Sequence, residues 1–287
     1  MIDILHIEST DACNAACPQC AREYDTNFDK NNLHHLTIEQ ILNCLDNKTL
    51  TNLKKMFMCG DYGDPAAGKH TMQIYEFFRF INPSITLGMN SNGGLRNTDF
   101  WHKLGGILNR PQDYCIFSID GLEDTNHIYR VNVNFKSVIN NAKAFIDAGG
   151  IAHWDMLIFE HNEHQINEAK ELARSLGFKW FRAKVSKRFT KHPISFLRPP
   201  KTFNLENIDG QIDCRALKEK SIYISAKGIL HPCCWLGYSD GVAYNNFDKV
   251  RESWNTNQPN IICKETCGTY NGNDNFANQW RIEEELC

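Results

Sequence analysis

Three cysteines near the start of the chain have a spacing that suits metal chemistry. Cys13, Cys17 and Cys20 form a Cys-x3-Cys-x2-Cys segment just after a short apolar run at residues 2–8. Thiolates at this spacing on one loop can bind three irons of a cubane iron–sulfur cluster and leave the fourth iron open to a small ligand. A zinc site or unrelated buried cysteines are the alternatives, but zinc sites usually close with four ligands and no fourth Cys or His lies close by in sequence. The segment therefore predicts a cluster with one open iron.

The other cysteines gather mostly at the opposite end of the chain. The sequence holds 12 cysteines in 287 residues, and six of them lie between Cys214 and Cys287. Clustered cysteines in a reducing compartment are more often metal ligands or catalytic groups than disulfides. Two separate groups therefore predict two metal sites.

The segments that must position these groups alternate between strand and helix patterns. Runs rich in β-branched and aromatic residues predict six strands, at residues 2–8, 54–59, 85–90, 114–119, 151–159 and 179–185. Helical patterns lie between them, at residues 70–81, 98–108, 135–148 and 163–176, and Thr37 with Gln40 predicts a further helix start. Strands that recur roughly every thirty residues predict an α/β fold with a parallel sheet.

The alternation stops after residue 187. Residues 188–213 are basic and contain prolines, as is typical of a connector. Residues 221–230 predict a β-hairpin around Gly228, and the rest of the tail is rich in loops and cysteines, with little apolar mass to fold without a metal. The predicted domains are a barrel at residues 1–187, the connector at 188–213, and a small cysteine-rich hairpin and loop domain at 214–287.

The cysteine loop behind the first strand resembles the hallmark of the radical S-adenosylmethionine (SAM) superfamily. The resemblance covers roughly residues 1–187 and implies a partial (β/α)6 barrel of the TIM type. In that family SAM chelates the open iron and is reductively cleaved to a 5′-deoxyadenosyl radical, which abstracts hydrogen from the substrate. One departure is Gln19, which stands where the family usually has an aromatic residue near the adenine, so the adenine contacts must differ in detail.

Segments after the later strands resemble those that line the SAM site in the family. Tyr62-Gly63-Asp64-Pro65 is similar to a Gly-Gly-Glu-Pro segment, in which Gly63 would permit close backbone approach and Asp64 would bind the SAM ammonium group, although these residues also suit a tight turn. Arg130 would pair with the SAM carboxylate, or else form a surface ion pair. The SAM contacts that the resemblance implies are Tyr62, Gly63, Asp64, Asn90, Ser91, Ser118, Asp120, Arg130 and Asn162.

Cys214, Gly228 and Cys233 resemble the start of a C-terminal extension called SPASM, or its shortened form, Twitch. There, the cysteines before and just after the hairpin bind an auxiliary cluster, and a downstream pair completes the ligands. The tail is short, so the resemblance implies a single auxiliary 4Fe–4S cluster, with the ligands Cys214, Cys233, Cys263 and Cys267. We expect Cys234 to face away, as neighbours on a strand do. Replacement of one ligand by Cys287, and a structural zinc site with the same four thiolates, remain alternatives.

A basic stretch at residues 182–201 holds seven Lys and Arg residues and no acid, in a chain of net charge −3. It borders the expected substrate entrance, where it would attract an anionic substrate, or else it is a solvated loop. Because residue 1 lies next to the first predicted strand, we expect no leader-peptide-binding domain ahead of it. We therefore expect oxidation, dehydrogenation or epimerisation of a small polar, sugar-like or anionic molecule, with radical modification of a peptide as the alternative.

Composition and charge exclude other classes. The net charge of −3 argues against general nucleic-acid binding. Neither a signal peptide nor a membrane-spanning run is evident, so we expect a cytoplasmic protein. A reductase, flavodoxin or ferredoxin is the expected electron donor. Rival interpretations are a two-cluster electron-transfer or scaffold protein that does not turn over SAM, and a structural zinc protein.

Overall fold

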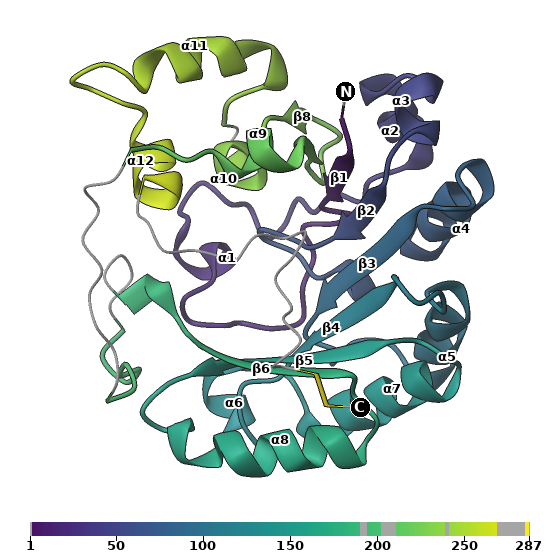
Figure 1. Cartoon of the computed structure of the whole chain (residues 1–287). Coiled ribbons are helices and arrows are strands. Elements are labelled where there is room, and N and C mark those ends of the chain that lie inside the picture. The colour runs from purple at the N-terminus through teal and green to yellow at the C-terminus, as the bar shows by residue number, and fades with distance from the viewer. Residues whose placement is uncertain (1, 190–193, 202–210, 239–240, 269–284, 287) are drawn as a thin grey trace.

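The computed structural model describes residues 2–189, 194–201, 211–238, 241–268 and 285–286 (Figure 1). Within these residues, eight strands form one open sheet in the order β6-β5-β4-β3-β2-β1-β7-β8. Neighbouring strands are parallel except β7 and β8, which are antiparallel. The strands are β1 (Ile4–Ile7), β2 (Lys55–Met58), β3 (Thr86–Ser91), β4 (Tyr114–Ser118), β5 (Ala152–Ile158), β6 (Trp180–Val185), β7 (Ser221–Ile224) and β8 (Leu230–His231). The first six confirm the predicted partial (β/α)6 barrel.

Helices connect the parallel strands and cover the outer side of the sheet. In Figure 1, α4, α5, α7 and α8 lie outside the curved sheet, whereas α1 lies on its concave side. No helix in the described part of the chain is long and apolar enough to cross a membrane. The helices are α1 (Ala21–Tyr24), α2 (Ile38–Cys44), α3 (Asn47–Thr51), α4 (Thr71–Ile81), α5 (Thr98–Ile107), α6 (Asn126–Tyr129), α7 (Phe135–Asp147), α8 (Ile166–Ser175), α9 (Arg215–Glu219), α10 (Cys234–Gly237), α11 (Phe247–Ser253) and α12 (Ile261–Cys267).

Side-chain caps set where several helices begin. The Thr37 hydroxyl accepts a hydrogen bond from the Gln40 amide, and the Gln40 side chain accepts one from the Thr37 amide, which confirms the predicted capping box at α2. The side chains of Asn97 and Asn134 cap α5 and α7 by accepting a hydrogen bond from a backbone amide in the first turn of each helix. Gly149 follows α7 with a φ of +89°, a conformation that costs a side-chain-bearing residue energy, so the helix stops there.

The two faces of the sheet differ in polarity. Residues on the outer face are apolar and pack against the helices, as Phe117 does with its ring centroid 5.0 Å from that of Trp101 on α5. Because successive strand residues point to opposite faces, the alternate positions face the barrel interior. Those interior positions carry buried polar side chains, among them His6, Lys55, Tyr114, His153, Asp155 and Arg182. The barrel interior is therefore a polar, charged environment below the carboxyl ends of the strands.

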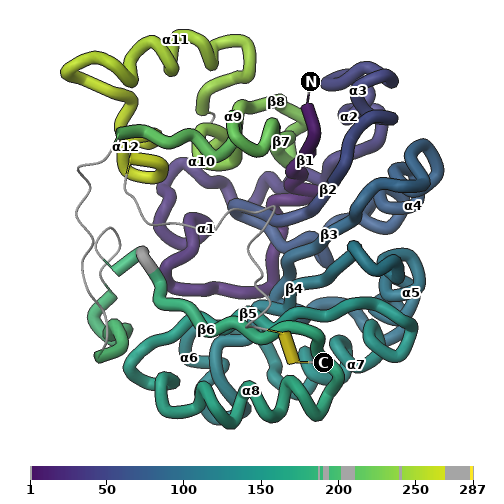
Figure 2. The backbone as a smooth tube through the Cα atoms, in the orientation of Figure 1, coloured from purple at the N-terminus to yellow at the C-terminus, as the bar shows by residue number. Residues whose placement is uncertain are grey.

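The segment after residue 213 joins the barrel directly. β7 pairs in parallel with β1, with Ile4 opposite Ser221 and Ile7 opposite Ile224, so β1 lies between β2 and β7. Figure 2 shows α9, α10 and α12 beside this end of the sheet, away from β5 and β6. The sheet thus continues into the tail that the sequence predicts as a separate auxiliary domain, and that division of the chain stays a prediction.

We predict that His6 makes stability depend on pH. Its Nε2–H donates to the Cys59 carbonyl at 2.6 Å, its ring stacks on Phe57, and burial lowers its pKa to about 4. The unfolded chain takes up a proton below the ordinary pKa of 6.5, whereas the folded chain does so only near 4, so stability falls as the pH drops between these values. The slope from one such group is up to about 1.4 kcal/mol per pH unit, or about 3 kcal/mol in all.

The His6→Phe variant tests this slope, because it keeps a ring on Phe57 but cannot be protonated. Urea unfolding at about pH 7 and about pH 5 should show a smaller loss of stability in the variant than in the unmodified protein. The variant keeps part of the slope, because burial also lowers the pKa of His153, to about 3. Parallel stability–pH curves for the two proteins would show that His6 does not carry the effect.

Candidate functional site

The loop between β1 and α1 carries the first three cysteines and lies at the carboxyl ends of the barrel strands, where barrel enzymes place their chemistry. Neighbouring loops hold it by backbone hydrogen bonds, from Asp64 N to Ala12 O at 2.8 Å and from Ala16 N to Val131 O at 3.1 Å. At Gly63, an added Cβ would lie 1.8 Å from the Thr10 carbonyl oxygen. Only glycine fits at Gly63, because the loop after β2 packs directly on the cysteine loop.

The three cysteine sulfurs meet polar groups from other elements. The Asn92 side-chain nitrogen lies 3.6 Å from Cys13 Sγ, and Arg130 Nη1 lies 3.7 Å from Cys17 Sγ. The Cys20 thiol faces a backbone carbonyl of the loop after β2, at 3.9 Å. Donors directed at Cys13 and Cys17 suit thiolates that carry negative charge, as cluster ligands do.

Burial holds all three groups in the thiol form when no metal replaces the proton. It raises the pKa of Cys13 to about 12 and that of Cys17 to about 11, and it also raises the pKa of Cys20. The charges of the other two cysteines add to the rise at Cys13, as expected for groups that lie near one another. A multiply charged cluster is the kind of group that would stabilise three such thiolates together.

Asp64 is buried and already has hydrogen-bond partners within the protein. Its Oδ1 accepts from Ala66 N at 2.9 Å and from the Ser91 hydroxyl at 2.8 Å, and its Oδ2 accepts from Asn92 N at 2.7 Å. The carboxylate therefore joins the loop after β2 to the end of β3. Asp64 also caps the short 3-10 turn Pro65–Ala67, so the turn-forming role of this segment is present.

Tyr62 lies on the outer side of the same loop. Its ring stacks on Phe28 with centroids 4.6 Å apart, and its hydroxyl donates to Asp25 at 2.6 Å. Its backbone amide and that of Gly63 both donate to Glu8 Oε1. The Tyr62 side chain thus holds the loop against the segment after α1.

Asp120, Arg130 and Asn162 form a second buried network. Arg130 Nε lies 2.6 Å from Asp120 Oδ2, and Asp120 Oδ1 accepts from Leu157 N. The Asn162 side chain forms hydrogen bonds with the backbone of Phe159, Asp120 and Leu157. Burial lowers the pKa of Arg130, but the charges of Asp120, Cys17 and Tyr129 together raise it by more, so Arg130 stays charged beside Cys17. The Arg130 ion pair is buried rather than on the surface.

Other polar atoms near the cysteine loop are left for a ligand. Asn90 Oδ1 and Gln19 Nε2 are buried and have no hydrogen-bond partner among the described residues. The Ser118 hydroxyl likewise makes no hydrogen bond within the described chain. Of the residues assigned to SAM contacts, Asn90 and Ser118 keep unused capacity, whereas Asp64, Ser91, Asp120, Arg130 and Asn162 are engaged internally. The unpaired atoms fit a bound polar molecule at this edge of the barrel.

A cavity beside β7 is lined by the second group of cysteines. Cys214 precedes α9, Cys233 precedes α10, and Cys263 and Cys267 are four residues apart and so share one face of α12. Burial, together with the charges of the other three cysteines, raises the pKa of Cys233 to about 12, so the four groups are close to one another. The remaining lining is largely apolar and includes Phe247, Trp254, Trp235 and Leu236. Four thiols around one enclosed space suit a cluster with all its irons bound.

Cys234 also borders this cavity, but it begins α10 instead of lying on a strand. Besides Cys233, the groups whose charges act on its thiol are Asp61 and Cys59, on the barrel side. Cys287 lies outside the described residues. Within the described chain, no three His, Cys, Asp or Glu side chains converge on a point that one metal ion could occupy. A cubane binds each thiolate to a separate iron and does not need such a point.

Asp61 lies near Cys20 and acts on Cys234, and no sequence pattern indicates this role. Its carbonyl oxygen faces Cys20 Sγ at 3.9 Å, and its charge acts on Cys234. Asp61 Oδ2 is buried without a hydrogen-bond partner in the described chain. Burial, and then the nearby Glu8 carboxylate, holds the pKa of Asp61 well above its usual range. One residue of the loop after β2 therefore adjoins both sites.

The basic stretch divides into residues with different surroundings. Lys184 Nζ lies 2.6 Å from Asp155 Oδ2 in the barrel interior, and Arg182 Nε lies 2.9 Å from Asp155 Oδ1. Arg188 donates to the Gln19 carbonyl at 2.7 Å, next to Cys20. Arg198 and Lys201 are exposed and pair with Glu160 and Glu163. Lys191 and the side chain of Lys187 lie outside what the structure describes.

Comparison with known families decides the classification. The family model described as the radical SAM superfamily matches residues 7–173, which is more than half of the chain. The chain belongs to the radical SAM superfamily. The match includes all three cysteines of the loop after β1 and ends within α8. No curated protein matches the sequence.

Solved structures share the fold of this radical SAM protein. SuiB of Streptococcus suis, bound to S-adenosylmethionine, superposes with a TM-score of 0.60 and 14% identity, covering 88% of this chain and 65% of SuiB. SuiB bound to its precursor peptide SuiA gives a TM-score of 0.61 at 14% identity, with coverage of 88% and 64%. The structure of anSMEcpe with AdoMet and the Cp18Cys peptide superposes with a TM-score of 0.54 and 13% identity, covering 80% of this chain and 73% of anSMEcpe. The chain thus spans about 65% of SuiB.

We predict that replacing Asp64 lowers stability together with SAM affinity. In Asp64→Ala, the Ser91 hydroxyl and the amides of Ala66 and Asn92 lose their acceptor while buried, which costs about 2–4 kcal/mol. Ser91→Ala removes only one of these donors and should cost about 1 kcal/mol. Urea unfolding and SAM-binding titrations on both variants measure the two effects. If Asp64→Ala loses SAM affinity at unchanged stability, its main role is contact with SAM and not support of the loops.

Proposed function

We propose that this chain is a radical SAM enzyme that oxidises an anionic substrate with the help of an auxiliary 4Fe–4S cluster. The single observation that supports this most is the position of Asp61, which adjoins Cys20 of the first cysteine group and Cys234 beside the second. A substrate bound near this residue would lie between the two groups. Oxidation needs both a group that removes hydrogen and an acceptor for the remaining electron, and the two cysteine groups would supply them.

Named residues would carry each part of the proposal. Cys13, Cys17 and Cys20 would hold the cluster that cleaves SAM to the hydrogen-abstracting radical, with electrons from a reductase, flavodoxin or ferredoxin. Asn90 and Gln19 would offer unpaired polar atoms to SAM, and Ser118 would offer its hydroxyl. Arg130, fixed by Asp120, would keep positive charge beside Cys17. Cys214, Cys233, Cys263 and Cys267 would close the auxiliary cluster, so the substrate would not bind to it.

Lys184 is the residue that would bind the anionic group of the substrate. It projects from β6 into the barrel beside Asp155, and its side chain is 35% exposed. Asp155, which is 10% exposed, holds Lys184 in place and is shared with Arg182. A partly exposed cation held over a polar interior suits a carboxylate or a phosphate.

Peptides are the second candidate class of substrate. SuiB was solved with its precursor peptide, and anSMEcpe was solved with peptides, on a fold that this chain shares. An acidic peptide would present the same carboxylate chemistry to Lys184 as a small anionic molecule. The peptide and small-molecule proposals therefore differ in the size of the substrate and not in the group that Lys184 would bind.

We predict that anaerobically reconstituted protein contains two 4Fe–4S clusters and forms 5′-deoxyadenosine when it is reduced with SAM. Changing Cys13, Cys17 and Cys20 together to Ala should remove about half of the iron and all 5′-deoxyadenosine formation, because these residues ligate the SAM-cleaving cluster. Cys267→Ala should also lower the iron content while SAM cleavage persists. Iron and sulfide analysis, with product chromatography, measures both outcomes.

Cys44→Ala is the matched control, because Cys44 lies in α2, where its thiol donates to the Gly228 carbonyl. Its iron content should not change. Zinc in place of iron at the second site would support the structural alternative. Two clusters without 5′-deoxyadenosine would support the electron-transfer or scaffold interpretation.

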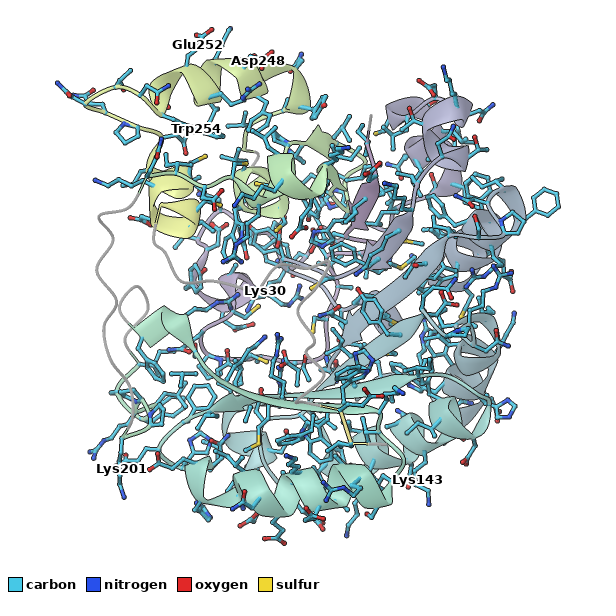
Figure 3. The ribbon with its side chains drawn as sticks, in the orientation of Figure 1. Lys30, Lys143, Lys201, Asp248, Glu252 and Trp254 are labelled. Carbon is cyan, nitrogen blue, oxygen red and sulfur yellow. The ribbon has the colours of Figure 1, made fainter. Side chains whose placement is uncertain are left out.

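We predict that Lys184→Gln abolishes the binding of anionic ligands. A screen of nucleoside phosphates, sugar phosphates and acidic peptides by thermal unfolding should find compounds that stabilise the protein. Loss of one charge-assisted hydrogen bond weakens binding by about tenfold or more, so these shifts should largely disappear in the variant. Lys201→Gln is the control, since Figure 3 places Lys201 at the outer edge of the molecule, where it pairs with Glu163. An anion that stabilises Lys184→Gln as well as the unmodified protein would contradict this role.

A further inference from the structure

Trp254 carries a buried polar atom in the wall of the cavity of the second cysteine group. It directly follows α11, and its ring meets Phe247 edge-on with centroids 6.1 Å apart. Figure 3 shows Trp254 between α11 and α12, whereas Asp248 and Glu252 lie on the outward side of α11. The Trp254 side chain therefore lines the same cavity as Cys214, Cys233, Cys263 and Cys267.

The indole N–H of Trp254 has no acceptor. Its Nε1 is buried and makes no hydrogen bond within the described residues. A buried donor without a partner costs about 1–3 kcal/mol, so such a group normally has an acceptor in the functional state of a protein. Besides the cysteines, the cavity lining includes the polar side chains of Glu219 on α9 and Thr266 on α12. The four cysteine sulfurs are thus among the acceptors that line this cavity.

Cys263 is the cysteine that Trp254 influences. The side chains of Trp254 and Cys263 line the same cavity, and the indole N–H is directed toward the Cys263 sulfur, where it would favour negative charge. Cys263 is buried on α12, which packs beside α10. An N–H that favours negative charge on a sulfur does so more strongly as that charge increases.

We propose that Trp254 donates its indole N–H to the Cys263 sulfur when the auxiliary cluster is present, and that this raises the reduction potential of the cluster. The inference rests on the proposed function, because it requires an iron–sulfur cluster at this site. Reduction adds one electron, and hydrogen bonds to the ligand sulfurs stabilise the added charge. Trp254 is thus a positioning and tuning residue that would make the cluster a better acceptor for the electron of the substrate.

The test uses the full chain with Cys13, Cys17 and Cys20 changed to Ala, so that only the auxiliary cluster contributes a signal. In this background, Trp254→Phe should lower the reduction potential, measured by a redox titration followed by electron paramagnetic resonance. A hydrogen bond that favours the reduced over the oxidised cluster by about tenfold corresponds to about 59 mV for one electron. Trp235→Phe is the control, since Trp235 lines the same cavity but its side chain is partly exposed to solvent. The reduction potential of the cluster should not change in this variant.

A second measurement does not depend on the folding of Trp254→Phe. Protein grown with 15N-indole tryptophan should show a 15N coupling to the reduced cluster in pulsed electron paramagnetic resonance, and Trp235→Phe should retain it. Absence of the coupling, or an unchanged potential in Trp254→Phe with full iron content, would overturn the hydrogen bond. A background protein that binds no iron would instead overturn the auxiliary cluster of the proposed function.

Discussion

The parallel pairing of β1 with β7 is the interaction that brings the two cysteine groups together. β1 also pairs with β2, so it occupies the middle of three parallel strands. The carboxyl ends of parallel strands meet at one edge of a sheet, and the loops that follow them become neighbours. The first cysteine loop follows β1 and Asp61 follows β2, whereas Cys233 follows β8, which runs back antiparallel to β7. This pairing therefore helps to hold the second cavity beside the barrel, together with contacts such as the hydrogen bond from the Tyr223 hydroxyl to Glu8.

Buried polar contacts then fix the loops at that edge. Asp64 joins the loops after β2 and β3, and Asp120 joins the loops after β4 and β5 while it holds Arg130 next to Cys17. Each carboxylate is removed from water, so each requires donors in a specific geometry. The result is a set of loops with positions determined before any ligand binds, as precise chemistry requires.

The sequence predicted the elements better than the partners of their side chains. Periodicity and caps placed the six barrel strands, α4, α5 and α7, because those signals are local, as at Thr37 and Gly149. The β1–β7 pairing joins residues more than two hundred positions apart, and no local pattern specifies it. Likewise, the family resemblance predicted that Asp64 and Arg130 lie at the site. It did not predict the protein groups that bind their side chains. Trp254 and Asp61 were missed because their significance lies in an unpaired atom, which only packing creates.

The position of β1 also has a consequence for how the chain is made. β1 is synthesised before its second neighbour, β7, which begins more than two hundred residues later in the chain. Until then, one edge of β1 has unpaired backbone groups, and such an edge favours pairing with other chains. The barrel half that carries the first cysteine loop can therefore be assembled early, whereas the second cavity forms only after β7, α10 and α12 have been synthesised.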